Sequence, residues 1–238
     1  MLTHRFRTIF GDIPRDWNTF FLKEALNLPL CTAGDWGDDS GQTSLKVVRS
    51  TNITNDGHLT LADIAVRYYP ARKISELALL KNDILVERSG GGPDQPVGRV
   101  VFLRNDLAGY GFGNFIQRLR IKEGFVEPRF LYYCLFELHR VGLVERLQFQ
   151  TTQMRNLDWR DYSRLILPLP PPAEQCLIAD LIDAADDVIQ VTKELLGITA
   201  SLHREQMQGP ANRLKTAMLQ NLVTGRIRLK SVTPIAAE

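Results

Sequence analysis

The sequence has few of the residues that build metal and redox sites. Its 238 residues include only 3 cysteines and 4 histidines. Cys31, Cys134 and Cys176 lie far apart, so no close-spaced pair indicates a zinc site or a redox motif. The histidines lack the His-Glu-x-x-His spacing of zinc enzymes. We therefore expect reduced, mostly buried cysteines, typical of a cytoplasmic protein, and neither a metal nor a cofactor.

Long apolar runs and an excess of one charge are also lacking. No stretch approaches the roughly 18 apolar residues that a membrane-spanning helix needs. Residues 1–10 contain no continuous apolar core after their arginines, which argues against a signal peptide. The formal net charge of +2 permits a nucleic-acid partner without indicating one. The sequence thus predicts a cytoplasmic protein without membrane contact.

The common nucleotide-binding and catalytic motifs are missing as well. Ser89-Gly-Gly-Gly92 has the glycines of a phosphate-binding loop but not the Gly-Lys-Ser/Thr that would follow. No Gly-x-Gly-x-x-Gly opens a helix after a strand, which excludes the familiar dinucleotide-binding pattern. Asp35, Asp38 and Asp39 could hold a divalent cation, but such a cluster is more often a solvated loop. No set of acid, base and metal residues can be assembled, so we expect no catalytic activity of the chain's own.

What is present divides into two regions near Pro168. Before it, three apolar segments rich in β-branched and aromatic residues predict strands, at 83–87, 98–103 and 115–121. The pattern of residues 127–147 predicts a helix, with Pro128 at its start. The sequence therefore predicts a mixed α/β (α+β) domain over residues 1–167, followed by a long coiled-coil-forming α-helix.

Residues 168–172 contain four prolines, which neither a helix nor a central strand tolerates, so they predict a stiff connector. Beyond it, residues 173–225 predict a long helical region. Gly209-Pro210 must interrupt or kink it, and residues 226–238 resemble a flexible tail. Apolar residues recur in alternating steps of four and three, a heptad pattern that we call the seam: Leu177, Leu181, Ala184, Val188, Val191, Leu195, Ile198 and Leu202.

A second apolar row, which includes Ile178, Ile182 and Ile189, lies beside the seam. So wide an apolar stripe must be covered. It could pack back onto its own domain or pair with a partner helix. We favour pairing, because the period of 3.5 residues is sustained.

Several stretches, in order along the chain, resemble the specificity subunit of type I restriction-modification enzymes. Gly11-Asp-Ile-Pro-Arg-Asp-Trp17 resembles the opening of its target recognition domain. Leu79-Leu-Lys-Asn-Asp-Ile-Leu-Val86, followed by Arg88-Ser-Gly-Gly91, resembles a second block, with Asn82 in place of the common glycine. Phe125 to Tyr133 resembles the helix start after the central strands. Leu167 to Gln175 and Leu222-Val-Thr-Gly-Arg226 resemble the start and end of the spacer helix.

A full-length subunit resembles this unit repeated twice, so the chain resembles a half-length form with one recognition domain. The resemblance implies a non-catalytic DNA reader that joins methyltransferase and motor-nuclease subunits. It also implies a bipartite double-stranded DNA target, with two recognition domains at opposite ends of paired helices. A homodimer would read an inverted repeat, and pairing with another half-subunit would give an asymmetric target.

The resemblance transfers no DNA-contacting residue, because recognition loops differ between family members. We nominate residues by their chemistry instead: arginine suits guanine, asparagine suits adenine, and glycine-rich backbone can approach phosphates. The candidates occupy three loops: Arg49, Asn52 and Asn55; Arg88, Ser89 and Arg99; and Thr151, Thr152, Gln153, Arg155 and Asn156. Two other interpretations stay open, a coiled-coil protein-interaction module without DNA specificity and an enzyme with an unfamiliar site.

Overall fold

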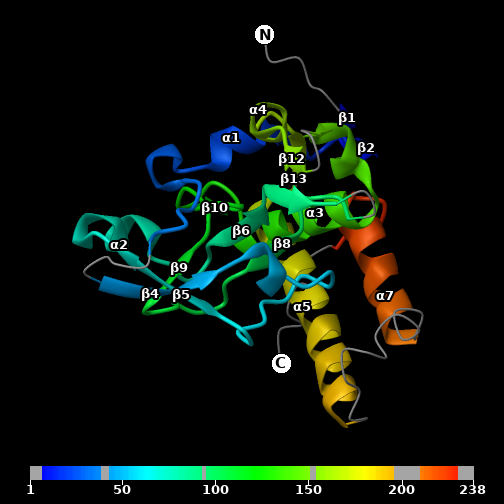
Figure 1. Ribbon diagram of the computed structural model, residues 1–238. Coiled ribbons are helices and arrows are strands. Elements are labelled where there is room, and N and C mark those ends of the chain that lie inside the picture. Colours follow the sequence, from blue (N-terminus) through cyan, green and yellow to red (C-terminus); the bar gives the residue numbers. More distant parts are fainter. Residues whose placement is uncertain (1–6, 39–42, 93–94, 151–153, 196–209, 230–238) are drawn as a thin grey trace, which may run out of the picture. The chain divides into compact units, whose positions relative to one another are not determined.

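The computed structural model describes residues 7–38, 43–92, 95–150, 154–195 and 210–229 (Figure 1). The chain divides into two compact units, one made of residues 1–19 with 167–238 and one made of residues 20–166. The first 19 residues thus group with the C-terminal helices. The predicted extents of the domain, connector, helical region and tail stay predictions.

The larger unit, residues 20–166, contains three small sheets. The central antiparallel sheet has the order β10-β6-β8, with β6 at Ile84–Glu87, β8 at Val100–Phe102 and β10 at Ile116–Leu119. These strands lie within the three segments that the sequence predicts. All four residues of β6 are buried, which agrees with its continuous apolar run between two neighbouring strands.

The two other sheets were not predicted. One has the order β5-β4-β9, in which β4 (Thr43–Val48) runs antiparallel to β5 (Ala65–Tyr69) and parallel to β9 (Tyr110–Phe112). The other has the order β11-β12-β7, with the strands Gln148–Gln150, Arg155–Leu157 and Ser89–Gly91. Both join segments far apart in the sequence, so no local pattern indicates their pairing.

One long helix and several short ones complete this unit. Helix α3 (Pro128–Arg140) starts with proline in its first turn and packs against β8, and Gly142 in the left-handed region follows its end. The predicted helix therefore ends before residue 147, with a short 3-10 turn after it. The shorter elements are α1 (Leu22–Ala25), α2 (Ala71–Leu77), α4 (Trp159–Tyr162), η1 (Leu28–Leu30), η2 (Ser50–Asn52) and η3 (Leu143–Leu147).

The core of this unit lies between the central sheet and the β5-β4-β9 sheet. It contains side chains from both sheets and from the loops that join them: Leu45, Val47, Val48, Ile53, Tyr69, Leu77, Leu79, Leu85, Val101, Leu103, Phe112 and Ile116. Ile53 directly follows η2, and its buried side chain packs in this core. The first candidate loop is therefore attached to the core through Ile53.

The other unit is mainly helical. Its helix α5 (Pro172–Leu195) is followed by α7 (Pro210–Met218) and a π-helical turn, η5 (Leu219–Val223). In Figure 1, α7 runs back along α5, and a buried ion pair joins Lys215 to Asp186. The strands β1 (Arg7–Thr8) and β2 (Gly11–Asp12) form a small hairpin, while β3 (Asn18–Phe21) and β13 (Ile166–Leu169) lie at the division between the units.

Pro210 begins α7, as expected of a proline that cannot continue a preceding helix. The fold is thus mixed α/β with a long C-terminal helix, as predicted. No helix in the described ranges is both long and apolar enough to cross a membrane.

Candidate nucleic-acid interface

The glycine-rich candidate loop leaves the central sheet at the end of β6 and forms strand β7. The Arg88 N–H donates to the Phe115 carbonyl at 2.8 Å, and the Leu157 N–H donates to the Arg88 carbonyl at 2.8 Å. Gly90 has a φ of +101°, and a Cβ there would lie 3.0 Å from the Phe115 ring. Glycine is therefore required by both conformation and space. These contacts place the loop between Phe115 and strand β12.

Strand β12 brings part of the third candidate loop to the same place. Asn156 pairs with Ser89 and Arg155 with Gly91, with an irregular register between the two pairs. Both Arg155 and Asn156 are half-buried. Their neighbours Thr151, Thr152 and Gln153 lie outside the described residues.

The first candidate loop approaches the glycine-rich loop from the other side. A Cβ at Gly90 would lie 3.6 Å from the Ser50 hydroxyl, so the η2 turn and β7 are neighbours. The Arg49 N–H donates to Asn52 Oδ1 at 2.9 Å, and Asn52 Nδ2 donates to the Ala62 carbonyl at 3.2 Å. Parts of all three candidate loops therefore lie together in one unit.

Two of the nominated side chains serve the fold in this arrangement. Asn52 is only 2% exposed, and its amide makes the two bonds that hold the turn. Arg99, 9% exposed, forms a paired hydrogen bond with Glu87 at 2.7 and 2.8 Å. It also donates to the Ile53 carbonyl at 2.6 Å, which ties β8 to the first loop. A buried, fully engaged guanidinium positions neighbouring loops and is poorly placed to meet DNA. Asn55, by contrast, is exposed.

A cavity of about 380 Å³ opens beside the first candidate loop. Its lining is mostly apolar, with two aromatic side chains, one arginine and several small or polar residues: Trp36, Arg49, Ser50, Thr51, Gly113, Asn114 and Phe115. Trp36 is 40% exposed, and the Arg67 guanidinium lies over its ring, 4.6 Å from the centroid. Exposed aromatic and cationic groups together are typical of surfaces that bind nucleic acid.

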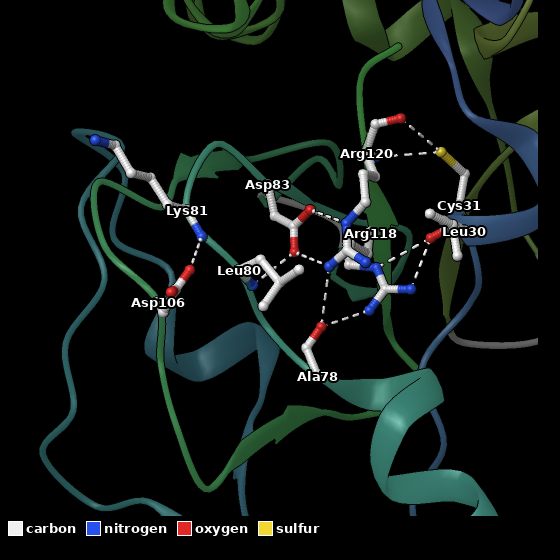
Figure 2. A network of polar contacts seen from close by, with 9 residues as sticks. All are labelled: Leu30, Cys31, Ala78, Leu80, Lys81, Asp83, Asp106, Arg118 and Arg120. Atoms are coloured by element: carbon white, nitrogen blue, oxygen red, sulfur yellow. Dashed lines mark hydrogen bonds and ion pairs between the residues drawn. The ribbon is translucent and has the colours of Figure 1, made fainter. Parts of the chain in front are cut away.

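A network beside the central sheet fixes the ends of its strands (Figure 2). Arg120 donates to both carboxylate oxygens of Asp83 at 2.7 Å. Arg118, only 1% exposed, donates to the Leu30 and Ala78 carbonyls, and burial lowers its pKa. Asn82, next to Asp83, has a φ of +70°. This left-handed turn explains why glycine or asparagine is needed there.

These features lie on a chain that matches a known family model. The model describes the type I restriction modification DNA specificity domain and matches residues 14–198. The chain belongs to this family.

Two solved structures support the fold of this specificity domain. One is the crystal structure of the type I restriction-modification system S subunit from M. genitalium, with 16% identity and a TM-score of 0.53. The match covers 93% of this chain and 50% of the M. genitalium chain. The other structure describes complex assembly and conformational transition of the type I R-M system, with 18% identity and a TM-score of 0.52. The match covers 91% of this chain and 48% of that chain. The chain thus spans about half the length of these structures.

Two of the motifs that resemble those of specificity subunits, 11–17 and 167–175, meet at one carboxylate in the helical unit. Glu174 accepts hydrogen bonds from Trp17 Nε1 at 3.0 Å and from Arg228 Nε at 2.7 Å. Arg228 also donates to both carboxylate oxygens of Asp16, at 2.6 and 2.8 Å. Burial opposes ionisation of Glu174, but the bonds from Arg228 and Trp17 outweigh it and lower its pKa. We call these four residues the Glu174 latch.

Along α5 of this specificity domain, the two apolar rows have different surroundings. The second row is buried, as Ile178, Ile182 and Ile189 show. The described seam side chains face solvent: Leu177, Leu181, Ala184, Val188 and Val191. Ile198 and Leu202 lie outside the described residues, as does the side chain of Leu195.

Sequence reasoning missed several residues of the interface. Trp36, Asn114 and Phe115 line the cavity but come from segments that no motif singles out. Asp63, which contacts Arg49, was also missed. A weak signal was available for Asn114-Phe115, because a polar residue and an aromatic residue follow directly on Gly111-Phe-Gly113. The structure gives no support to a cation site at Asp35, Asp38 and Asp39. The described residues contain no group of three or more side chains that could hold a metal ion, and Asp39 lies outside them.

Proposed function

We propose that the chain reads one half of a bipartite double-stranded DNA target for a type I restriction-modification complex. The observation that carries the proposal is that parts of three polar loops lie together, beside an aromatic cavity that the first loop helps to line, in a chain of the DNA specificity domain family. Within this surface, Arg49, Arg88 and Arg155 supply positive charge, and Ser89 and Asn156 supply hydrogen-bonding groups. Asn55 lies nearby in sequence and is exposed.

The surface has the two kinds of group that specific DNA readers combine. Arginine and the glycine-rich backbone of residues 89–92 suit phosphate contacts, which set the position on the duplex. Arg49 and Asn114 suit base edges in the major groove, where guanine and adenine present matching acceptors and donors. Asn52 and Arg99 act indirectly, by holding the loops that carry these groups.

The chemistry itself belongs to partners in this proposal. The chain supplies position, methyltransferase subunits supply methyl transfer, and a motor-nuclease subunit joins for cleavage. The chain is not an enzyme in this account. The second structure is titled for assembly of such a system, which is the basis for expecting partner docking.

The exposed seam of α5 pairs with a second copy of the chain. Five apolar side chains at heptad spacing lie in solvent on one face, and an unpaired helix does not keep such a face bare. A second copy would supply the second recognition domain that the resemblance to full-length specificity subunits implies; this chain matches only about half of each of the two solved structures. A two-fold pair would place identical readers in inverted orientation, so the target is an inverted repeat with a fixed spacer.

Selection of random-sequence duplexes by the purified full chain tests the reading function. We expect one enriched motif and an apparent affinity that falls steeply with salt, because phosphate contacts release counterions. Weak binding that does not depend on salt, with no motif, would favour an interaction module instead. Metal-dependent cleavage by the chain alone would favour an enzyme.

A further inference from the structure

A surface ion pair lies at the edge of the aromatic cavity. One terminal nitrogen of Arg49 donates both to the Asp63 carbonyl at 2.6 Å and to its carboxylate at 2.9 Å. The Asp63 side chain is 94% exposed and the Arg49 side chain 28% exposed. An exposed pair of this kind contributes little to folding stability. Stability therefore does not explain why the two groups are held together.

The backbone is arranged to hold this pair. Asp63 has a φ of +52°, one of two positive values among the described residues other than glycine. Such conformations cost free energy and cluster at functional sites. The backbone N–H of Arg49 is also fixed, through Asn52, to the neighbouring Ala62. Both ends of Arg49 are thus tied to the segment that ends at Asp63, which sets the direction of its side chain.

The pair keeps donors and an acceptor available side by side. The second terminal nitrogen of Arg49 makes no hydrogen bond to any described residue, and neither does the second carboxylate oxygen of Asp63. The Arg49 Nε is buried without a partner and one terminal nitrogen already donates twice to Asp63, so the second terminal nitrogen, with its two N–H groups, is the one that can reach a ligand. The exposed pair therefore presents two N–H donors next to one oxygen acceptor.

This order matches the major-groove edge of one base pair. Guanine presents two acceptors, O6 and N7, and its cytosine presents the N4 amino donor next to them. No other pair has two adjacent acceptors followed by a donor in that order. Building on the proposed DNA-reading function, we propose that Arg49 and Asp63 together recognise one G·C pair. Arg49 donates to the guanine, and Asp63 accepts from the cytosine amino group while orienting Arg49.

Base analogues and conservative variants of the full chain test this assignment. Arg49→Lys keeps the charge but loses the planar fork, and Asp63→Asn keeps a side chain that tolerates positive φ but loses the charge. In duplex selection, each variant relaxes the preference for G·C at the same single position, by about tenfold or more, as expected for loss of one base-specific contact. The other positions of the motif keep their preferences.

Measurements on the selected site then separate the two roles. Replacing the guanine by 7-deazaguanine removes N7, and replacing the cytosine by pyrimidin-2-one removes the N4 amino group. Each analogue weakens binding by wild-type protein about tenfold. Arg49→Lys no longer responds to the first analogue, and Asp63→Asn no longer responds to the second. A purely structural role for Asp63 would leave its variant still sensitive to the second analogue.

Arg129→Lys is the control, because the Arg129 side chain is 27% exposed, close to the 28% of Arg49, and forms an ion pair with Glu127 at 2.7 Å at the start of α3. It leaves the motif unchanged. If the wild-type chain enriches no motif, the proposed function fails and this inference falls with it. If the wild-type chain enriches a motif but Asp63→Asn keeps the full G·C preference, only this inference is overturned. Uniform weakening across all sequences by Arg49→Lys assigns Arg49 to phosphate and also overturns it.

Discussion

At the scale of single residues, burial decides which polar side chains can meet DNA. Arg99 and Arg49 are both arginines in polar stretches of sequence, yet Arg99 is enclosed by Glu87 and by carbonyls of the first loop. Those partners lie 12 to 49 residues away along the chain. Sequence patterns near Arg99 cannot reveal contacts at such separations, so its chemistry alone suggested a phosphate ligand.

Removal of Arg99 should destabilise the larger unit. Arg99→Ala leaves the Glu87 carboxylate, 2% exposed, without its partner. Loss of one member of a buried pair costs about 3–5 kcal/mol. We expect urea unfolding to show that loss, whereas Arg129→Ala, at a half-exposed pair, costs less than about 1 kcal/mol. Equal stabilities for these two variants would refute the positioning role of Arg99.

The Glu174 latch makes stability depend on pH. The folded state lowers the pKa of Glu174, so its stabilising effect is complete above the ordinary value of 4.5 and is lost as the pH falls through the lower folded value. Glu174→Gln should therefore be less stable than wild type at pH 7, and the difference should shrink below about pH 4. Denaturant unfolding at several pH values measures it. A difference that stays constant down to pH 3 would contradict the latch.

At the scale of elements, periodicity located the long helix but could not say which apolar row packs inside the chain. Both rows on α5 are apolar, and each satisfies a helical period. The structure separates them, because Ile178 and Ile182 are buried while Leu181 and Val188 are exposed. Helix α7, which is distant in the sequence, packs against α5 only in the folded chain.

The exposed seam predicts the effect of a charge on association. Val188→Asp places a carboxylate in an apolar heptad seam, where desolvation without a partner opposes pairing. We expect the wild-type chain to form a dimer in light scattering and the variant to be a monomer with the same helix content. Asp187→Asn, one position away and exposed, is the control and should stay dimeric. A dimeric Val188→Asp variant would exclude this face as the contact.

Strands with a local signal were also predicted, whereas those that pair over long distances were not. The segment 83–87 has a continuous apolar run and became the centre of a sheet. Strand β7, by contrast, is Ser89-Gly-Gly91, which has low strand propensity and pairs only because β12 lies alongside it. The proposed interface depends on this second kind of strand, so its geometry could not be predicted from the sequence.

At the scale of the whole molecule, the order of short motifs was the strongest predictor. Each motif is weak alone, but Trp17 and Glu174 come from two different motifs and form a hydrogen bond in the structure. Arg228, which lies two residues beyond a third motif, donates to the same carboxylate. The motif position of Asn82 likewise corresponds to a left-handed turn. The family could therefore be predicted from the sequence. The proposed base-reading groups could not, because the loop of residues 49–63 takes its geometry from contacts with residues far away in the sequence.

We propose that this chain determines which DNA sequence its partners methylate. Long-read sequencing of the host genome, with the gene present and with it deleted, tests this claim most directly. We predict that one bipartite adenine-methylation motif disappears on deletion and returns with the wild-type gene, and that its halves are inverted repeats if the chain pairs with itself. An unchanged set of methylated motifs in an organism that expresses the chain would contradict the claim.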